Sequence, residues 1–177
     1  MRPNRIRRRT LLGLVAAGIV ATLTLNACGT NAPTDGTAAS ADTAATLTSL
    51  SGQKITLPAA GRPTAVFFFS VGCGECAGGM KSLGQAAADA HQAGVKASFL
   101  AVDVDPGESA DTINEFMKSI DAEQVPSVID ADATLTQRYQ VAALSTLIVV
   151  DGNGKVTYRA TDPSAETITA ELNEAGA

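Results

Sequence analysis

Apolar residues follow two different periods from about residue 64 onward. Continuous apolar runs at residues 64–70, 95–104 and 144–150 are typical of strands that are buried on both faces of a sheet. Between the first two runs and after the second, residues 76–92 and 111–120 repeat apolar side chains at helical spacing, so each predicts an amphipathic helix. Strands that alternate with helices of this length predict parallel pairing through right-handed crossovers.

Turn signals predict the remaining elements. Asp151-Gly152-Asn153-Gly154 is typical of a hairpin, and Asp162 followed by Pro163 predicts the N-cap and first residue of a last helix. The shorter elements that we expect are two strands within 47–57, a strand at 127–129, a helical turn at 133–139 and a strand at 155–160. Because the closing hairpin adds an antiparallel edge, the predicted fold is α/β, a mixed central sheet with helices on both faces.

The N-terminus has the pattern of an export signal. Five arginines among the first nine residues precede an uncharged apolar stretch at residues 11–25. This stretch is shorter than the roughly 20 residues that a membrane-spanning helix needs, so a cleaved signal peptide over residues 1–27 is the favoured interpretation. Arg8-Arg9 leaves both twin-arginine and general secretory export open.

Leu25-Asn26-Ala27-Cys28 resembles the lipobox of bacterial lipoproteins. The resemblance implies cleavage before Cys28 and a lipid on its sulfur, whereas the alternative is a free thiol after an ordinary cleavage site. Residues 29–45 are small or polar and cannot contribute to a core. We therefore expect a lipidated cysteine and flexible linker at 28–46, a single domain at 47–177, and a location on the extracytoplasmic face of the bacterial cell membrane.

The net charge of the chain also changes sign at the predicted cleavage site before Cys28. Residues 1–27 carry +5, so the formal charge of −5 for the whole chain leaves −10 for residues 28–177. A body this acidic repels phosphate backbones, and nucleic acid is not an expected partner.

Cys73-Gly74-Glu75-Cys76 lies between a predicted buried strand and a predicted helix. Backbone N–H groups at a helix N-terminus favour a thiolate, so Cys73 is the expected attacking sulfur and Cys76 the resolving one. A structural disulfide, half of a zinc site and two unrelated thiols are the alternatives. Zinc lacks a second cysteine pair, and His91 is the only histidine. Redox chemistry is the favoured interpretation, without a cofactor or a resident metal.

From residue 47 onward the chain resembles the membrane-anchored thioredoxin-like proteins of the TlpA and ResA type. The segments that carry the resemblance are 48–57, 66–76 with the CxxC pair, 102–105, 126–141 and 144–154. The resemblance implies a thioredoxin-like fold and an extracytoplasmic, membrane-anchored thiol–disulfide oxidoreductase. We expect it to reduce protein disulfides, and expect a membrane electron donor to regenerate the dithiol.

Two positions depart from that pattern. Gly72 stands where the family usually has a tryptophan, and Ser145, followed by Thr146, stands where thioredoxins place a cis-proline. A non-proline cis bond costs about 2.5–4 kcal/mol, so we expect this loop to be trans or strained. If Ser145 merely replaces the proline in an otherwise thioredoxin-like site, Ser145→Pro is expected to be tolerated; if the serine leaves room for a metal on the two thiolates, the substitution is expected to abolish metal binding. The departure also keeps open a metal (copper) carrier, using Cys73, Cys76 and Ser145, or a noncatalytic thioredoxin-like module.

Peroxide-reducing relatives carry Pro-x-x-x-Thr-x-x-Cys, where this chain has Val66, Ser70 and Cys73. Because the proline is missing, a thiol peroxidase is the weaker alternative.

Charged residues near the cysteine pair are candidate modulators of its chemistry. Glu75 is expected to oppose thiolate formation by like charge, which favours a reducing pair. His91 is expected to be a solvated residue at a helix end. Asp103, Asp105, Glu108 and Asp111 are expected to form a solvated acidic loop without calcium-loop spacing.

Overall fold

The computed structural model describes residues 44–177, and a five-stranded sheet of order β5-β4-β3-β6-β7 lies at its centre. The strands are β3 (Thr64–Phe69), β4 (Ser98–Asp103), β5 (Ser127–Ile129), β6 (Thr146–Val150) and β7 (Val156–Thr161). β3, β4 and β5 run parallel, whereas β6 is antiparallel to both β3 and β7. The predicted mixed sheet is confirmed. The strand direction changes between β3 and β6. The connection from β5 to β6 stays at the end of the sheet where β5 finishes, so β6 runs back in the opposite direction.

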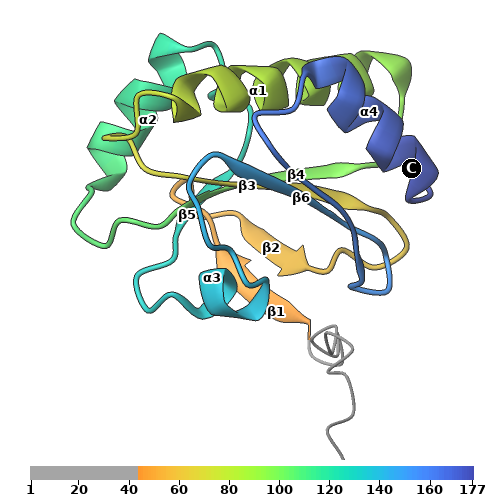
Figure 1. Ribbon diagram of the computed structural model, residues 1–177, viewed down its shortest axis with the longest axis horizontal. Coiled ribbons are helices and arrows are strands. Elements are labelled where there is room, and N and C mark those ends of the chain that lie inside the picture. Colours follow the sequence, from red (N-terminus) through yellow and green to blue (C-terminus); the bar gives the residue numbers. More distant parts are fainter. Residues whose placement is uncertain (1–43) are drawn as a thin grey trace, which may run out of the picture. The chain divides into compact units, whose positions relative to one another are not determined.

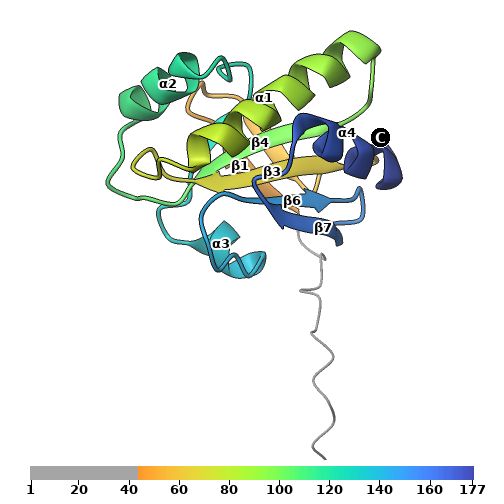
Figure 2. The ribbon, with the colours of Figure 1, turned by 45° about the horizontal axis from the view of Figure 1, so that its top comes forward.

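Helices cover both faces of the sheet, as the sequence predicts. Three of them, α1 (Cys76–Ala93), α2 (Ala110–Ser119) and α4 (Ala165–Glu174), lie on one face. The short α3 (Thr134–Arg138) and the hairpin of β1 (Ala45–Thr48) and β2 (Lys54–Leu57) lie on the other. Figure 2 shows α2 and α4 on either side of α1. This arrangement buries both faces of β3.

The side chains of β3 divide the core into two clusters. Phe67 and Phe69 pack on the three-helix face against Met80 and Leu83 of α1, among others. Phe68 packs on the opposite face, where Tyr139 meets its ring edge to face. All three phenylalanines are fully buried, as expected for a continuous apolar run. The strand that leads into the CxxC pair is therefore held rigidly from both sides.

The ends of the helices follow capping rules with one correction. α1 ends at Gly94, whose φ of 69° is readily available only to glycine. α4 begins after Ser164, whose side chain accepts a hydrogen bond from the N–H of Thr167. The prediction that Asp162 is this N-cap is therefore wrong, and Pro163 is not the first helical residue. Asp162 instead adopts a left-handed conformation, with φ of 47°.

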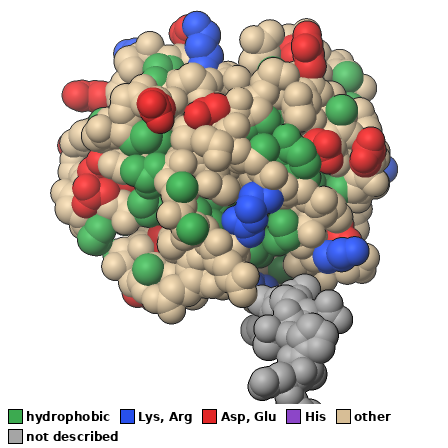
Figure 3. All heavy atoms as spheres, in the orientation of Figure 1, with side chains coloured by type: hydrophobic (Ala, Val, Ile, Leu, Met, Phe, Trp, Pro, Cys, Tyr) green, Lys and Arg blue, Asp and Glu red, His purple; other side chains and the backbone are tan. Residues whose placement is uncertain are grey.

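The predicted signal peptide, Cys28 and most of the predicted linker lie outside the described residues. Within residues 44–177, no helix is both long and apolar enough to cross a membrane. Acidic side chains are scattered over the visible face of this region, among neutral and apolar ones (Figure 3).

Candidate redox site

Cys73 and Cys76 form a disulfide between the end of β3 and the start of α1, with their Cα atoms 5.4 Å apart. Two successive turns place them there: the N–H of Cys73 donates to the carbonyl of Ser70, and the N–H of Cys76 donates to the carbonyl of Cys73, each at 3.0 Å. Cys76 is fully buried in the three-helix face of the core, whereas Cys73 is partly exposed. An incoming disulfide therefore reaches the sulfur of Cys73 first.

The residues next to the cysteines leave the pair open on one side. Glu75 is exposed at the N-cap position of α1, and its side chain caps no N–H group of the helix. Gly72 is exposed as well, and a Cβ placed on it would meet only the hydroxyl of Ser70 within 4 Å. The site therefore has no bulky side chain immediately before Cys73.

Glu108, from the loop between β4 and α2, holds the loop that precedes Cys73. Its carboxylate accepts hydrogen bonds from the Ser70 hydroxyl at 2.8 Å, the Val71 N–H at 2.9 Å and the Gly72 N–H at 3.3 Å. Although partial burial opposes its ionisation, these donors hold the pKa of Glu108 below its ordinary value. The expectation of a merely solvated acidic loop is wrong for this residue. The Ser70 hydroxyl, which the peroxidase pattern would use, is bound to Glu108.

Asp103 also departs from that expectation, because it is fully buried at the end of β4. One carboxyl oxygen accepts from the N–H of Asp105 at 2.9 Å, and no donor reaches the other oxygen, Oδ2. Burial, reinforced by the neighbouring Glu108, raises the pKa of Asp103 to about 7. The sequence offered one signal for the burial of Asp103. The residue lies inside the apolar run at 95–104, where a polar side chain is expected to be buried.

Ser145 is held in a trans, left-handed conformation. Among the described residues the cis peptide bond is Leu57–Pro58, and Ser145 has φ of 62°. Its N–H donates to the carbonyl of Phe68 at 3.0 Å, its hydroxyl donates to the carboxylate of Asp162, and its carbonyl accepts from the Asp162 N–H. The expected trans or strained loop is confirmed. The expected tolerance of Ser145→Pro is wrong, because proline lacks the N–H and cannot adopt this φ.

Thr146 begins β6, and its hydroxyl donates to the carbonyl of Ala143 at 2.7 Å. Asp162, which the sequence analysis placed at a helix cap, reaches α1 as well. A Cβ added to Gly79 of α1 would lie 2.7 Å from the Asp162 carboxylate and 2.5 Å from the ring of Phe67. Glycine at position 79 therefore allows the Ser145–Asp162 pair to approach the helix that starts at Cys76.

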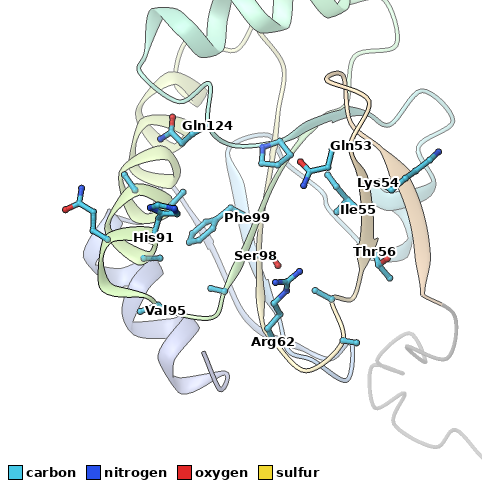
Figure 4. Close-up of a pocket in the computed structure, with 18 residues that line it drawn as sticks. Gln53, Lys54, Ile55, Thr56, Arg62, His91, Val95, Ser98, Phe99 and Gln124 are labelled. Carbon is cyan, nitrogen blue, oxygen red and sulfur yellow. The ribbon is translucent and has the colours of Figure 1, made fainter.

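His91 lies apart from the cysteines. It is exposed in the last turn of α1 and lines a groove of about 860 Å³, together with β2 and β4. Figure 4 shows Phe99 of β4 between His91 and Ile55 of β2. No cysteine lines this groove. Within residues 44–177, no group of three or more His, Cys, Asp and Glu side chains is placed to hold a metal ion.

The fold and the site define a thioredoxin-like redox protein, with a CxxC disulfide at the junction of a strand and a helix. The sequence matches the Redoxin family over residues 29–177, and the chain belongs to that family. It is 60% identical over 141 residues to the "Mercury resistance operon ORF3" protein of Streptomyces lividans, covering 79% of this chain and 72% of that protein.

Solved structures support the same fold. StoA from Bacillus subtilis matches with a TM-score of 0.64 and 18% identity, over 73% of this chain and 96% of StoA. The exposed lipoprotein thioredoxin Etrx1 from Streptococcus pneumoniae matches with a TM-score of 0.64 and 20% identity, over 75% of this chain and 99% of Etrx1. The predicted thioredoxin-like fold is therefore confirmed.

Proposed function

We propose that the chain is a membrane-anchored reductase of protein disulfides that acts outside the cytoplasm. The observation that carries the proposal is the disulfide between partly exposed Cys73 and fully buried Cys76. This asymmetry separates the roles of the two sulfurs, because only one of them is open to a large substrate.

In the proposed reaction the thiolate of Cys73 attacks one sulfur of a substrate disulfide. That S–S bond breaks, a mixed disulfide with Cys73 forms, and the other substrate sulfur leaves as a thiolate. Cys76 then loses its proton and attacks the sulfur of Cys73, which releases the second substrate thiolate. Two electrons pass to the substrate and the Cys73–Cys76 disulfide remains, so a membrane electron donor must reduce it before the next cycle.

The acidic surroundings of Cys73 favour the reducing direction. Glu108 places a carboxylate on the residue next to Cys73, and Glu75 lies between the cysteines. Both disfavour a thiolate, and oxidants are proteins that stabilise theirs. Equilibration with a glutathione or dithiothreitol couple should give a potential nearer about −270 mV than the oxidising extreme of about −120 mV. A potential at that extreme would contradict the reductase proposal.

The proposed anchor is a lipid on Cys28. Its support is the basic segment, the short apolar core and the lipobox-like residues 25–28. Because two acyl chains hold a protein stably where one does not, the mature protein should stay in the membrane fraction and begin at a modified Cys28. Cys28→Ala should release it with the signal still cleaved. An intact mass with unmodified Cys28 would remove the anchor from the proposal.

A second candidate function is transport or sequestration of a soft metal ion by the reduced dithiol. The mercury resistance operon named for the Streptomyces lividans relative favours this candidate, because thiolates are the preferred ligands of soft ions. Hg(II) and Cu(I) can be held by two sulfurs alone, whereas zinc in proteins is almost always held by four ligands.

The two candidates are separated by assaying them side by side. Reduced protein is titrated with Hg(II) and with Cu(I) against a competing thiol ligand, and the same preparation is assayed for reduction of insulin disulfides. Reductase activity with weak metal binding supports the first function. Tight stoichiometric binding without reductase activity supports the second. Cys73→Ser should abolish both activities.

A further inference from the structure

A buried carboxyl group lies beside the hydrogen bonds that hold the loop before the attacking cysteine. Asp103, fully buried at the end of β4, lies beside Glu108, and its Oδ2 atom meets no donor among the described residues. Glu108 accepts hydrogen bonds from Ser70 and from the two residues that follow it. The carbonyl of Ser70 then accepts from the N–H of Cys73 at 3.0 Å. The backbone position of Cys73 thus depends on Glu108, and Asp103 is the buried neighbour of Glu108.

A hydrogen bond between the two carboxyl groups requires a proton. Two ionised carboxylates offer only acceptors, so they cannot form a hydrogen bond with each other. Glu108 receives one hydroxyl and two N–H donors, which favour its ionised form. Asp103 is fully buried, and no donor from the described chain satisfies its Oδ2 atom. The proton therefore belongs on Asp103, where it turns an unsatisfied acceptor into a donor.

We propose that Glu108 is a positioning residue for Cys73 and that a proton held by Asp103 keeps Glu108 in place on the loop. The inference rests on the proposed redox function and adds a control of Cys73 reactivity to it. When Asp103 releases its proton to solvent, it can no longer donate a hydrogen bond to Glu108, and a second negative charge appears beside the loop. The second negative charge disfavours a thiolate on Cys73. The burial-raised pKa of Asp103, about 7, places this change near neutral pH.

The charged groups that act on Asp103 are acidic. Glu108 and Asp105 act on Asp103 from its own side, and Glu75 lies at the start of α1. After β5, Asp130 donates its N–H to the carbonyl of Asp103, and its own carboxylate is held by the N–H groups of α3. Val71 and its neighbours on the loop are uncharged. No cation among the groups acting on Asp103 compensates a second negative charge at this site.

The test measures the reactivity of Cys73 itself. The full chain carrying Cys28→Ala is reduced and alkylated with iodoacetamide between pH 5 and pH 9, and the modified Cys73 peptide is quantified by mass spectrometry. Two variants probe the pair, Glu108→Gln and Asp103→Asn. Glu115→Gln is the matched control, because it removes one exposed acidic charge from α2 without touching the loop.

Glu108→Gln should raise the alkylation rate at pH 6 about threefold or more, because a like charge beside the thiolate is removed. Asp103→Asn keeps a permanent donor toward Glu108. It should leave the alkylation rate at pH 6 within about twofold of the parent. The inflection near neutral pH that ionisation of Asp103 adds to the parent's plot of rate against pH should be absent from this variant. Glu115→Gln should change neither feature. Proton uptake by the two thiols shifts the potential with pH in every variant. Between pH 6 and pH 8 the parent should show an additional shift that Asp103→Asn lacks.

Two outcomes would overturn the inference. One is an Asp103→Asn profile that keeps the inflection near neutral pH, and the other is a Glu108→Gln rate equal to that of the parent. A fall in melting temperature without a change in Cys73 reactivity would reduce both residues to a structural role. Because alkylation needs only a reduced thiol, a protein that never reduces a substrate still reports on this inference, and the two failures are distinguishable.

Discussion

Two buried serines at the end of the sheet that carries the cysteine pair donate hydrogen bonds to carboxylates, and the two arrangements differ in kind. Ser70 and Glu108 lie on ordinary backbone, and Glu108 also binds two N–H groups of the loop before Cys73. Ser145 and Asp162 both have positive φ, 62° and 47°, and they join the start of β6 to the segment before α4. One pair places charge beside the attacking sulfur, whereas the other fastens two chain segments together.

The two serine–carboxylate hydrogen bonds have different effects because the two carboxylates contact different groups. Glu108 is partly buried and lies beside a protonatable neighbour, so solvent screens its charge less than it screens an exposed carboxylate. Asp162 is exposed, and its carboxylate accepts from the Ser145 hydroxyl and lies against Gly79 of α1. We therefore expect substitutions at the Ser145–Asp162 pair to change stability, and substitutions at the Ser70–Glu108 pair to change reactivity.

Ser145→Pro should give the largest effect. Proline removes the N–H that donates to Phe68 and excludes the φ of 62°, so the loop must move. We expect a loss of about 3 kcal/mol in the free energy of unfolding, measured by chemical denaturation of the oxidised protein. Ser145→Gly is the matched control, because glycine accepts the conformation and keeps the N–H; it should lose about 1 kcal/mol or less. Equal losses in the two variants would mean that the hydroxyl, and not the backbone, fastens the segments.

Gly79→Ala and Gly78→Ala compare two adjacent helical glycines with opposite surroundings. A Cβ at position 79 would meet Phe67 at 2.5 Å and Asp162 at 2.7 Å, whereas a Cβ at position 78 meets nothing within 4 Å. Gly79→Ala should therefore destabilise the protein by about 1–3 kcal/mol through overpacking. Gly78→Ala should stabilise it by about 0.5–1 kcal/mol, because alanine favours the helix. A stabilising Gly79→Ala would show that Asp162 does not pack against α1.

Sequence patterns predicted the fold well because β3 and its neighbours are long apolar runs separated by clear helical periods. They also placed Cys73 and Cys76, since the CxxC spacing is local. The contact of Glu108 with the loop before Cys73 spans 36 to 38 residues along the chain, and no local pattern reports such a distance. Asp162 was assigned to a helix cap by a rule that Ser164 satisfies instead. Local sequence spacing therefore could not predict the long-range polar contacts of the site.

The pH dependence of stability offers a third way to sharpen the comparison. Between about pH 4 and pH 7 the folded protein keeps a proton on Asp103 that the unfolded chain has lost, since burial raises the pKa of Asp103 from 3.8 to about 7. The folded state then binds more protons, so the free energy of unfolding falls as pH rises through this range. Asp103→Asn should flatten this slope, by an amount on the order of 1 kcal/mol between pH 5 and pH 8.

Denaturation midpoints of parent and Asp103→Asn, taken at each pH, isolate this contribution from other titrations. Glu108, with a lowered pKa, contributes stability that is lost only as pH falls below the ordinary range for glutamate, so it does not confound the window above pH 5. Identical slopes in the two proteins would mean that Asp103 is ionised in the folded state.

Glu75→Gln should give the smallest effect, on the alkylation rate of Cys73. Glu75 is exposed and caps nothing, so solvent screens its charge, and its removal should raise the rate at pH 6 by about twofold or less. Glu108→Gln, measured in the same assay, should exceed this because its carboxylate is partly buried and binds the loop directly. If the two variants gave equal increases, charge near the sulfur would be sufficient and the hydrogen bonds of Glu108 would not matter. A rate that fell in Glu75→Gln would mean that its carboxylate assists the thiolate, against the like-charge argument.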